Sequence, residues 1–210
     1  MDKFAERIYD PASRELAIFK KTHEEWGGYS NMASGYPLLI NNFNIRSSEA
    51  LYQALKYTEH PDIQLKILEQ SSPMSAKMVA KPFKELIRPD FEIIKIRIMK
   101  WCIYAKLLCN YEKFSKLLLE SENKIIVEES RRDNFWGAKR TPDDKLIGVN
   151  VLGRILMEAR ENLKKEAIQD DLLPFQTIDN FKILGRNIEV VHKLNEPMII
   201  PKHSNQPWLL

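Results

Sequence analysis

The chain has 210 residues, 44% of them hydrophobic and 29% charged, which predicts one globular domain with a substantial core. The net charge of +3 does not by itself require a nucleic-acid partner, and no apolar run is long enough for a transmembrane helix. The first residues lack a signal-peptide pattern, and we interpret Cys102 and Cys109 as reduced core residues, so we expect a cytoplasmic protein, or a nuclear one in a eukaryote.

The first part of the chain combines a weakly patterned segment with two turn signals. Residues 1–25 are charged and are expected to form a short strand or a docking segment. The glycine pair that follows Trp26 allows a ligand to approach the backbone closely. Residues 36–46 predict a β-hairpin that turns at Asn41 and Asn42.

The stretch 47–56 predicts a helix that begins at a serine N-cap and carries three polar residues along one stripe. At ~100° per residue, Gln53 lies about 40° from Glu49, and Lys56 lies about 20° from it on the other side. A carboxylate, an amide and an amine beside apolar residues favour acid–base or covalent chemistry. The plainer alternative is that Glu49 only stabilises the start of the helix.

Helices dominate the rest of the predicted fold, which is α+β: a mainly helical single domain with a small β-sheet. The charged stretch 164–171 is expected to end the compact unit, with a short β-containing extension after it that includes a small hairpin or two edge strands within 181–191. Hydrophobic periodicity and Pro, Ser and Asn start signals place the other elements as helices over about 61–70, 72–84, 91–109, 113–119 and 150–163, with a strand at 125–129.

Two further segments carry candidate site residues. The loop after the predicted strand offers Asp133 as a second carboxylate and Trp136 as a flat surface for a base or sugar. The glycine-flanked helix start that contains Arg154 is suited to bind a phosphate. The alternatives are a packed tryptophan and an ordinary helix start. Histidines and cysteines do not cluster at metal-ligand spacing, so no metal or cofactor is expected.

Six sequence blocks occur in a fixed order over residues 26–160. They are Trp-Gly-Gly-Tyr-Ser-Asn, Ser-Ser-Glu-Ala-Leu-Tyr-Gln-Ala-Leu-Lys, Ser-Pro-Met-Ser-Ala-Lys, Ile-Met-Lys-Trp-Cys-Ile-Tyr-Ala-Lys, Glu-Ser-Arg-Arg-Asp-Asn-Phe-Trp-Gly-Ala and Asn-Val-Leu-Gly-Arg-Ile-Leu-Met. This order resembles the NADAR family, with a NADAR-like catalytic domain over 26–165, an N-terminal segment 1–25 and an extension over 166–210. One departure is Phe91, which stands where the family often has tryptophan.

The resemblance implies an N-glycosidase that acts on ribosylated amino groups. One branch of the family cleaves phosphoribosylated intermediates of riboflavin synthesis, and another removes ADP-ribose from guanine bases in DNA. The Trp-Gly-Gly start, the block around Glu49 and the tail around Phe181 are more similar to the second branch. We therefore expect ADP-ribosylated guanine, in DNA or as a nucleoside, as the substrate, a functional pairing with a DNA ADP-ribosyltransferase, and no membrane partner.

A mechanism consistent with this substrate makes Lys56 a Schiff-base nucleophile at C1 of the ribose. Glu49 then acts as general acid–base, and Asp133 is the alternate base or orients the ribose. In the competing mechanism one of these carboxylates protonates the leaving nitrogen and the other activates water, and Lys56 only binds phosphate or positions Glu49. A non-catalytic module that binds ADP-ribose or NAD is the third alternative. The residues expected to bind substrate are Gly28, Ser30, Asn31, Gln53, Trp136, Gly137, Asn150, Gly153 and Arg154.

Overall fold

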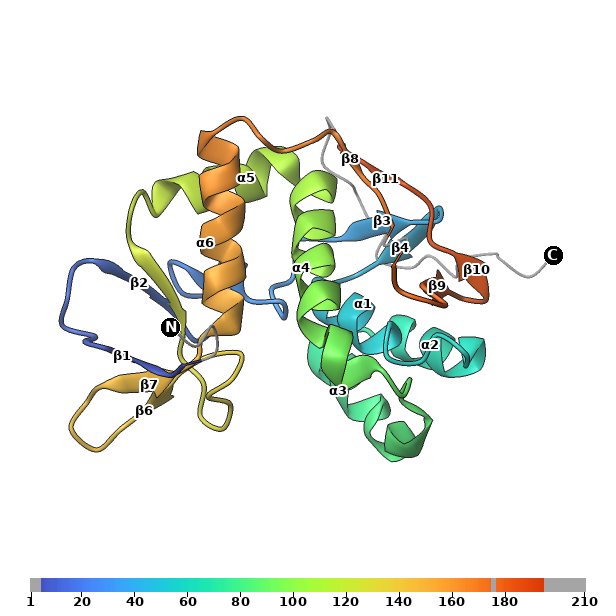
Figure 1. The fold of residues 1–210 in the computed structure, drawn as a ribbon, viewed down its shortest axis with the longest axis horizontal. Helices are drawn as coiled ribbons and strands as arrows, with labels where there is room; N and C mark the ends of the chain where they lie inside the picture. Colours follow the sequence, from blue (N-terminus) through green and yellow to red (C-terminus); the bar gives the residue numbers. More distant parts are fainter. Residues whose placement is uncertain (1–4, 175–176, 195–210) are drawn as a thin grey trace.

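A computed structural model describes residues 5–174 and 177–194 of the chain. One long helix, α4 (Phe91–Cys109), runs through the middle of the molecule, as Figure 1 shows. It is packed on one side by α1 (Ser48–Ala54) and on the other by α6 (Val151–Lys164). Residues that recur at three- and four-residue steps along α4 are fully buried, among them Ile98 and Trp101, which explains its central position. The predicted α+β class, mainly helical with small sheets, is confirmed.

Helix α1 begins where the sequence predicted and ends earlier than predicted. The Ser47 hydroxyl caps it by accepting a hydrogen bond from the Ala50 amide at 3.2 Å, as predicted. The helix ends at Ala54, however, and Lys56 lies in the turn that follows. The prediction that Lys56 shares a helical stripe with Glu49 is therefore wrong, because the backbone leaves the helix before it reaches Lys56.

The remaining helices follow the predicted pattern with one interruption. Pro82 lies where the helix predicted over 72–84 would have its last turn. Proline cannot donate the backbone hydrogen bond that the turn needs, so the chain breaks into α3 and a 3₁₀ helix. The observed bounds are Pro61–Leu68 for α2, Pro73–Val79 for α3, Lys81–Leu86 for the 3₁₀ helix and Tyr111–Glu120 for α5.

The N-terminal segment forms two strands that pair with later parts of the chain. Strand β2 (Leu16–Phe19) runs parallel to β5 (Ile125–Glu128), so that Phe19 pairs with Glu128. Strand β1 (Arg7–Tyr9) pairs antiparallel with β7 (Leu146–Gly148). A short strand β6, Lys139–Arg140, completes that sheet on the other side of β7. This arrangement puts the end of β2 beside the end of β5.

The predicted hairpin is confirmed as β3 (Leu38–Ile40) and β4 (Phe43–Ile45). Its turn residues Asn41 and Asn42 have φ angles of 51° and 62°, the left-handed conformation that a two-residue hairpin turn requires and that asparagine tolerates. Asn41 is also largely buried, because later residues pack over this turn.

Residues after α6 pack on the same core as the helices. The ring of Phe181 meets Trp101 of α4 edge to face with 5.1 Å between ring centroids. A turn at Leu184 and Gly185 closes a small hairpin within 181–191, one of the two predicted arrangements. The strands are β8, Asp171–Leu172; β9, Lys182–Ile183; β10, Arg186–Asn187; and β11, Val191–His192. The end of the predicted extension, from residue 195, lies outside the described residues.

Candidate active site

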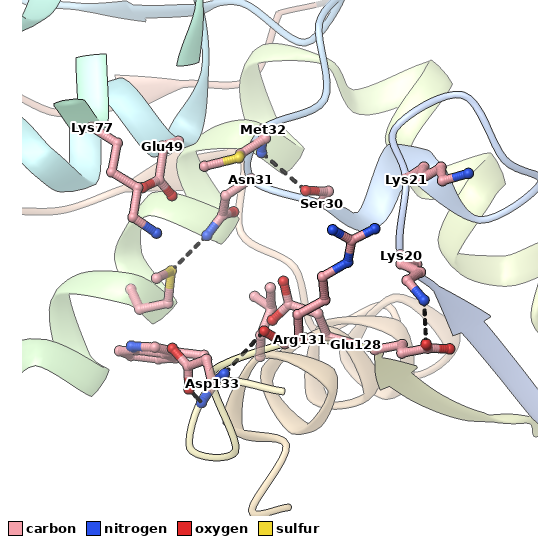
Figure 2. Close-up of a pocket in the computed structure, with 15 residues that line it drawn as sticks. Lys20, Lys21, Ser30, Asn31, Met32, Glu49, Lys77, Glu128, Arg131 and Asp133 are labelled. Carbon is pink, nitrogen blue, oxygen red and sulfur yellow. Dashed lines mark hydrogen bonds and ion pairs between the residues drawn. The ribbon is translucent and has the colours of Figure 1, made fainter. Parts of the chain in front are cut away.

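A cavity of about 400 Å³ opens where the loops after β2 and β5 face α1, α3 and α4. Figure 2 shows side chains from the two loops, α1 and α3 converging on it, and Met99 of α4 also lines it. Its volume is in the range of small-molecule sites. The lining residues are Lys20, Lys21, Ser30, Asn31, Met32, Glu49, Lys77, Met99, Glu128, Glu129, Ser130, Arg131, Asp133, Trp136 and Leu152.

Besides Glu129, three carboxylates reach this cavity, from α1, β5 and the loop after β5. Glu49 comes from the first turn of α1 and accepts a hydrogen bond from the Gln53 side chain at 2.8 Å. Glu128 is the last residue of β5, and Asp133 follows it in the loop. Burial raises the pKa of Glu128 to about 7, and the charges of Asp133 and Glu49 add to that rise. A carboxyl group with this pKa is suited to donate a proton near neutral pH.

Asp133 also shapes the loop that carries it. One carboxylate oxygen accepts hydrogen bonds from the amides of Phe135, at 2.9 Å, and Trp136, at 2.8 Å. The Trp136 ring, placed in this way, meets Tyr52 of α1 edge to face at 5.8 Å between centroids. The predicted stacking residue therefore lies in the cavity wall, held by the predicted second carboxylate.

Lys77 is a cavity residue to which the sequence analysis gave no role. It projects from α3, and Figure 2 shows its side chain directed toward Glu49 and Asn31. Helix α3 is fixed at its start by Ser72, whose hydroxyl accepts from the Ser75 amide at 3.0 Å. No ion pair holds Lys77 among the residues that the structure describes. The signal that could have identified it was present, because Lys77 ends the block Ser-Pro-Met-Ser-Ala-Lys.

Lys56 lies in a different environment. Its amine is 5.2 Å from the centre of the Tyr52 ring and 5.1 Å from that of Phe91, and it does not line the cavity. Burial lowers the pKa of Lys56, which the charge of Glu49 partly opposes. Phe91, the departure noted in the sequence, thus forms one side of an aromatic enclosure for this amine. The proposed nucleophilic role of Lys56 stays a prediction, and the cavity itself presents another amine.

The other predicted binding residues divide into two groups. Ser30 and Asn31 line the cavity. The side-chain amide of Asn31 donates through its nitrogen to the Met99 sulfur at 2.8 Å, and its side-chain oxygen accepts from the Ser48 hydroxyl at 3.0 Å. The predicted residues that do not line it are Gly28, Gln53, Gly137, Asn150, Gly153 and Arg154.

The glycine-flanked helix start lies behind the cavity wall. The side chain of Asn150 accepts from the Glu128 amide at 3.1 Å and donates to the Ile126 carbonyl at 2.8 Å, so it ties the start of α6 to β5. Gly153 packs against the same strand, where a Cβ atom would collide with the Ile126 carbonyl. Arg154 donates to the carbonyl of Ala5 at 3.0 Å. These contacts give the segment a packing role, and its predicted phosphate contact stays a prediction.

Cationic residues line the side of the cavity formed by the loops after β2 and β5. Lys20 is paired with Glu129 at 2.5 Å, and Arg140 contacts the other oxygen of Glu129 at 2.6 Å. These two hydrogen-bonded cations lower the pKa of Glu129 to about 2. Lys21 and Arg131 have no ion pair within the described ranges, and Figure 2 shows Arg131 reaching across the cavity on the side of Lys20. The cavity therefore has Lys77 beside Glu49 on one side and the cations Lys20, Lys21 and Arg131 on the other.

The described ranges contain no cluster of His, Cys, Asp or Glu arranged to hold a metal ion. They also contain no helix long and apolar enough to span a bilayer.

Comparison with known proteins assigns the chain to a family. The NADAR domain matches residues 18–164, which include every residue that lines the cavity. The chain belongs to the NADAR family. The NADAR match begins within β2, so the strand that leads into Lys20 and Lys21 is part of it.

The chain is similar to proteins named as N-glycosidases and to proteins named for riboflavin biosynthesis. It is 28% identical to N-glycosidase YbiA of Escherichia coli over 77% of this chain and 97% of that protein. The NMR structure of E. coli YbiA superposes with a TM-score of 0.63, at 29% identity, over 80% of this chain and 96% of that one. It is 31% identical to the riboflavin biosynthesis protein PYRR of Zea mays over 73% of this chain, and the match spans only 26% of that protein.

Proposed function

We propose that this NADAR protein removes ADP-ribose from guanine bases in DNA. The protein is a hydrolase of N-glycosidic bonds, as its N-glycosidase relatives indicate. The observation that carries the proposal is the cavity itself. It joins an amine without an ion-pair partner in the described residues, Lys77, to three carboxylates, and it presents cations to a phosphorylated group.

The arrangement suits cleavage through a Schiff base. A ribose joined to an amino nitrogen opens its ring to give an imine at C1. Lys77 adds to C1 after its ammonium has given a proton to Glu49, and the guanine nitrogen leaves with a proton from Glu128, so that the C–N bond to the base is exchanged for one to lysine. Water then adds to C1, the lysine nitrogen departs, and free ADP-ribose and Lys77 are regenerated.

The carboxylates have separate roles in this scheme because their surroundings differ. Glu128, whose pKa is raised to about 7, is the proton donor. Glu49 lies toward Lys77 and accepts the proton that its amine must lose. Asp133 holds Trp136 in place through the loop amides. In the alternative without a covalent lysine, Glu128 protonates the base and Glu49 activates water.

The cations on the other side support a substrate with phosphate groups. Arg131 and Lys21 reach the cavity from the loops after β5 and β2, and both are free of ion pairs in the described residues. Arginine binds phosphate oxygens with paired hydrogen bonds. Trp136 supplies an aromatic face for a nucleobase beside the carboxylates. The same cations lie at the mouth, where an approaching DNA strand would be attracted in a salt-dependent manner.

A second candidate substrate is a phosphoribosylated amino-pyrimidine intermediate of riboflavin synthesis. It is favoured by the names of two relatives, PYRR of Zea mays and the riboflavin biosynthesis protein VVA0006 of Vibrio vulnificus, which is 31% identical over 76% of this chain and 42% of that protein. A cavity of about 400 Å³ accommodates a substrate of this size.

The test is release of ADP-ribose from an oligonucleotide that carries ADP-ribosylated guanine, measured beside turnover of the phosphoribosylated pyrimidine. Release from the oligonucleotide at a higher kcat/KM supports the proposal, and preference for the pyrimidine replaces it with the second candidate. Binding of ADP-ribose without turnover of either substrate identifies a binding module. Borohydride reduction during turnover, followed by mass analysis of the peptides, identifies the lysine that carries the sugar.

A further inference from the structure

Lys106 is a fully buried lysine whose amine contacts backbone carbonyls and aromatic rings. It projects from α4, its relative exposure is 0%, and no salt bridge to it occurs in the described residues. Buried lysines are rare because the ammonium loses its hydration, and those that persist usually have a partner that compensates. The contacts of Lys106 therefore call for an explanation beyond packing.

The amine of Lys106 is bonded to the backbone of the segment that enters the cavity. It donates to the carbonyl of Gly28 at 2.5 Å and to that of Ser30 at 3.0 Å. The rings of Tyr36 and Phe114 lie 4.5 and 4.3 Å from the amine and close the site from the other side. Burial lowers the pKa of Lys106 well below its ordinary range, and the nearby Lys113 lowers it further.

The same segment is held at two more points. The Asn31 side chain contacts Met99, which precedes Lys106 on α4 by seven residues, close to two helical turns, so both lie on one stripe of the helix. The backbone carbonyl of Asn31 accepts from the Glu49 amide at 3.1 Å, at the start of α1. Lys106 thus holds the segment at Gly28 and Ser30. Met99 and the Glu49 amide hold it one residue further on, at Asn31.

From this geometry we infer that Lys106 is a positioning residue of the N-glycosidase site, which acts by holding the carbonyls of Gly28 and Ser30 so that Ser30 and Asn31 face the substrate. Without the amine, the partly buried Gly28 carbonyl loses this donor and the Ser30 carbonyl keeps only the Ala33 amide, so the segment has to move to recover hydrogen bonds. The inference rests on the proposed function, because Lys106 touches no substrate and acts only through the residues that do.

The experiment compares Lys106→Met with Lys113→Met. Methionine keeps most of the apolar stem of Lys106 and removes the donor. Lys113 is the matched control, because its amine also lies over Tyr36, at 4.3 Å, and donates to the neighbouring Gly35 carbonyl at 3.1 Å, but it is exposed. We expect kcat/KM per folded molecule to fall at least tenfold in Lys106→Met and less than twofold in Lys113→Met.

A double-mutant cycle separates positioning from a general structural role. If Lys106 acts through Asn31, adding Lys106→Met to Asn31→Ala lowers kcat/KM by less than threefold beyond Asn31→Ala alone. If the losses of kcat/KM in Lys106→Met and Asn31→Ala multiply in the double variant, the inference is overturned. It is also overturned if Lys106→Met lowers the Tm and leaves kcat/KM unchanged. If Lys106→Met does not fold, the cycle is repeated with Lys106→Gln, which keeps two N–H donors on a shorter stem.

A readout that needs no substrate keeps this test apart from that of the proposed function. The amides of Ala33 and Glu49 donate to the carbonyls of Ser30 and Asn31, so their hydrogen exchange reports whether the segment is held. We expect faster exchange at these amides in Lys106→Met and unchanged exchange in α5. Unchanged exchange at Ala33 and Glu49 overturns the inference even if the wild type cleaves neither substrate.

Discussion

Polar side chains occur both in the cavity and on the core surface under the residues after α6, but their surroundings differ: Lys77 and Arg131 of the cavity are exposed, whereas Asn41, Gln64 and Arg88 are buried. On that surface, Asn41, Gln64 and Arg88 are each bonded to backbone atoms of residues 179–189. In the cavity, Lys77 and Arg131 have no ion pair in the described part of the chain. Side chains matched to backbone groups hold a fold together, whereas polar groups that converge on open space await a ligand.

The largest expected effect is a difference in kcat/KM between substitutions at Lys77 and at Lys56. Lys77→Ala should lower kcat/KM by roughly a thousandfold or more, because it removes the amine in the cavity. Lys56→Ala should lower it by less than about tenfold, since its amine contacts the rings of Tyr52 and Phe91 and not the cavity. Steady-state kinetics with borohydride trapping measures both.

The opposite ranking, with trapping lost only in Lys56→Ala, would return the nucleophilic role to Lys56. Equal and small losses in both variants would favour the mechanism in which carboxylates activate water.

The next effect concerns the proton donor. Glu128→Gln should lower kcat about a hundredfold. In the wild type, kcat should fall as the pH rises through about 7, because the carboxyl group of Glu128 loses the proton that it donates. This falling limb should be absent from the pH profile of the variant. A wild-type profile that is flat between pH 6 and 8 would contradict the assignment.

The same substitution should alter stability with a defined sign. The pKa of Glu128 is raised from 4.5 to about 7, so between these values the folded state binds more protons than the unfolded state and becomes less stable as pH rises. Glu128→Gln removes this loss. Its free energy of unfolding relative to wild type should increase by roughly 1 to 3 kcal/mol between pH 4.5 and 7 and then stay level, as measured by urea titration.

A smaller effect is expected at the cationic side. Arg131→Ala should raise KM about tenfold and change kcat less than twofold, because the guanidinium binds phosphate equally in the ground and transition states. Arg132→Ala is the control, since Arg132 is the adjacent exposed residue and does not line the cavity. Equal effects of both substitutions would indicate general attraction by charge instead of a phosphate contact.

The smallest effect on activity is expected on the other surface. Gln64→Ala should reduce the free energy of unfolding by about 2 kcal/mol, because it leaves the Leu184 amide and the Lys182 carbonyl without their partner. Its kcat/KM should match the wild type. Gln70 is the control for stability, because this half-buried residue just after α2 donates from its side chain to the local Lys66 carbonyl at 2.9 Å. A loss of activity in Gln64→Ala would show that the two regions are coupled.

The sequence predicted the fold well where local signals agree with packing. Asn41 and Asn42 specified the hairpin, and the repeat of apolar residues specified α4. It extended α1 too far, to Lys56, because helical periodicity says which face a residue occupies only while the helix continues. It gave no role to Glu128 or Lys77, although one ends a strand before a site loop and the other ends a family block. Their convergence depends on how α3 packs beside α1, which no local pattern encodes.

The parallel pairing of β2 with β5 has a practical consequence for anyone who shortens this protein. A recombinant piece that begins at residue 26 would lack Lys20 and Lys21 and would leave the edge of β5, with Ile126 and Val127, open to solvent. Such an edge recruits strands from other molecules. A trimmed version that precipitates or loses affinity would thus reveal a missing neighbour, and a peptide spanning 5–21 supplied separately is the remedy to try first.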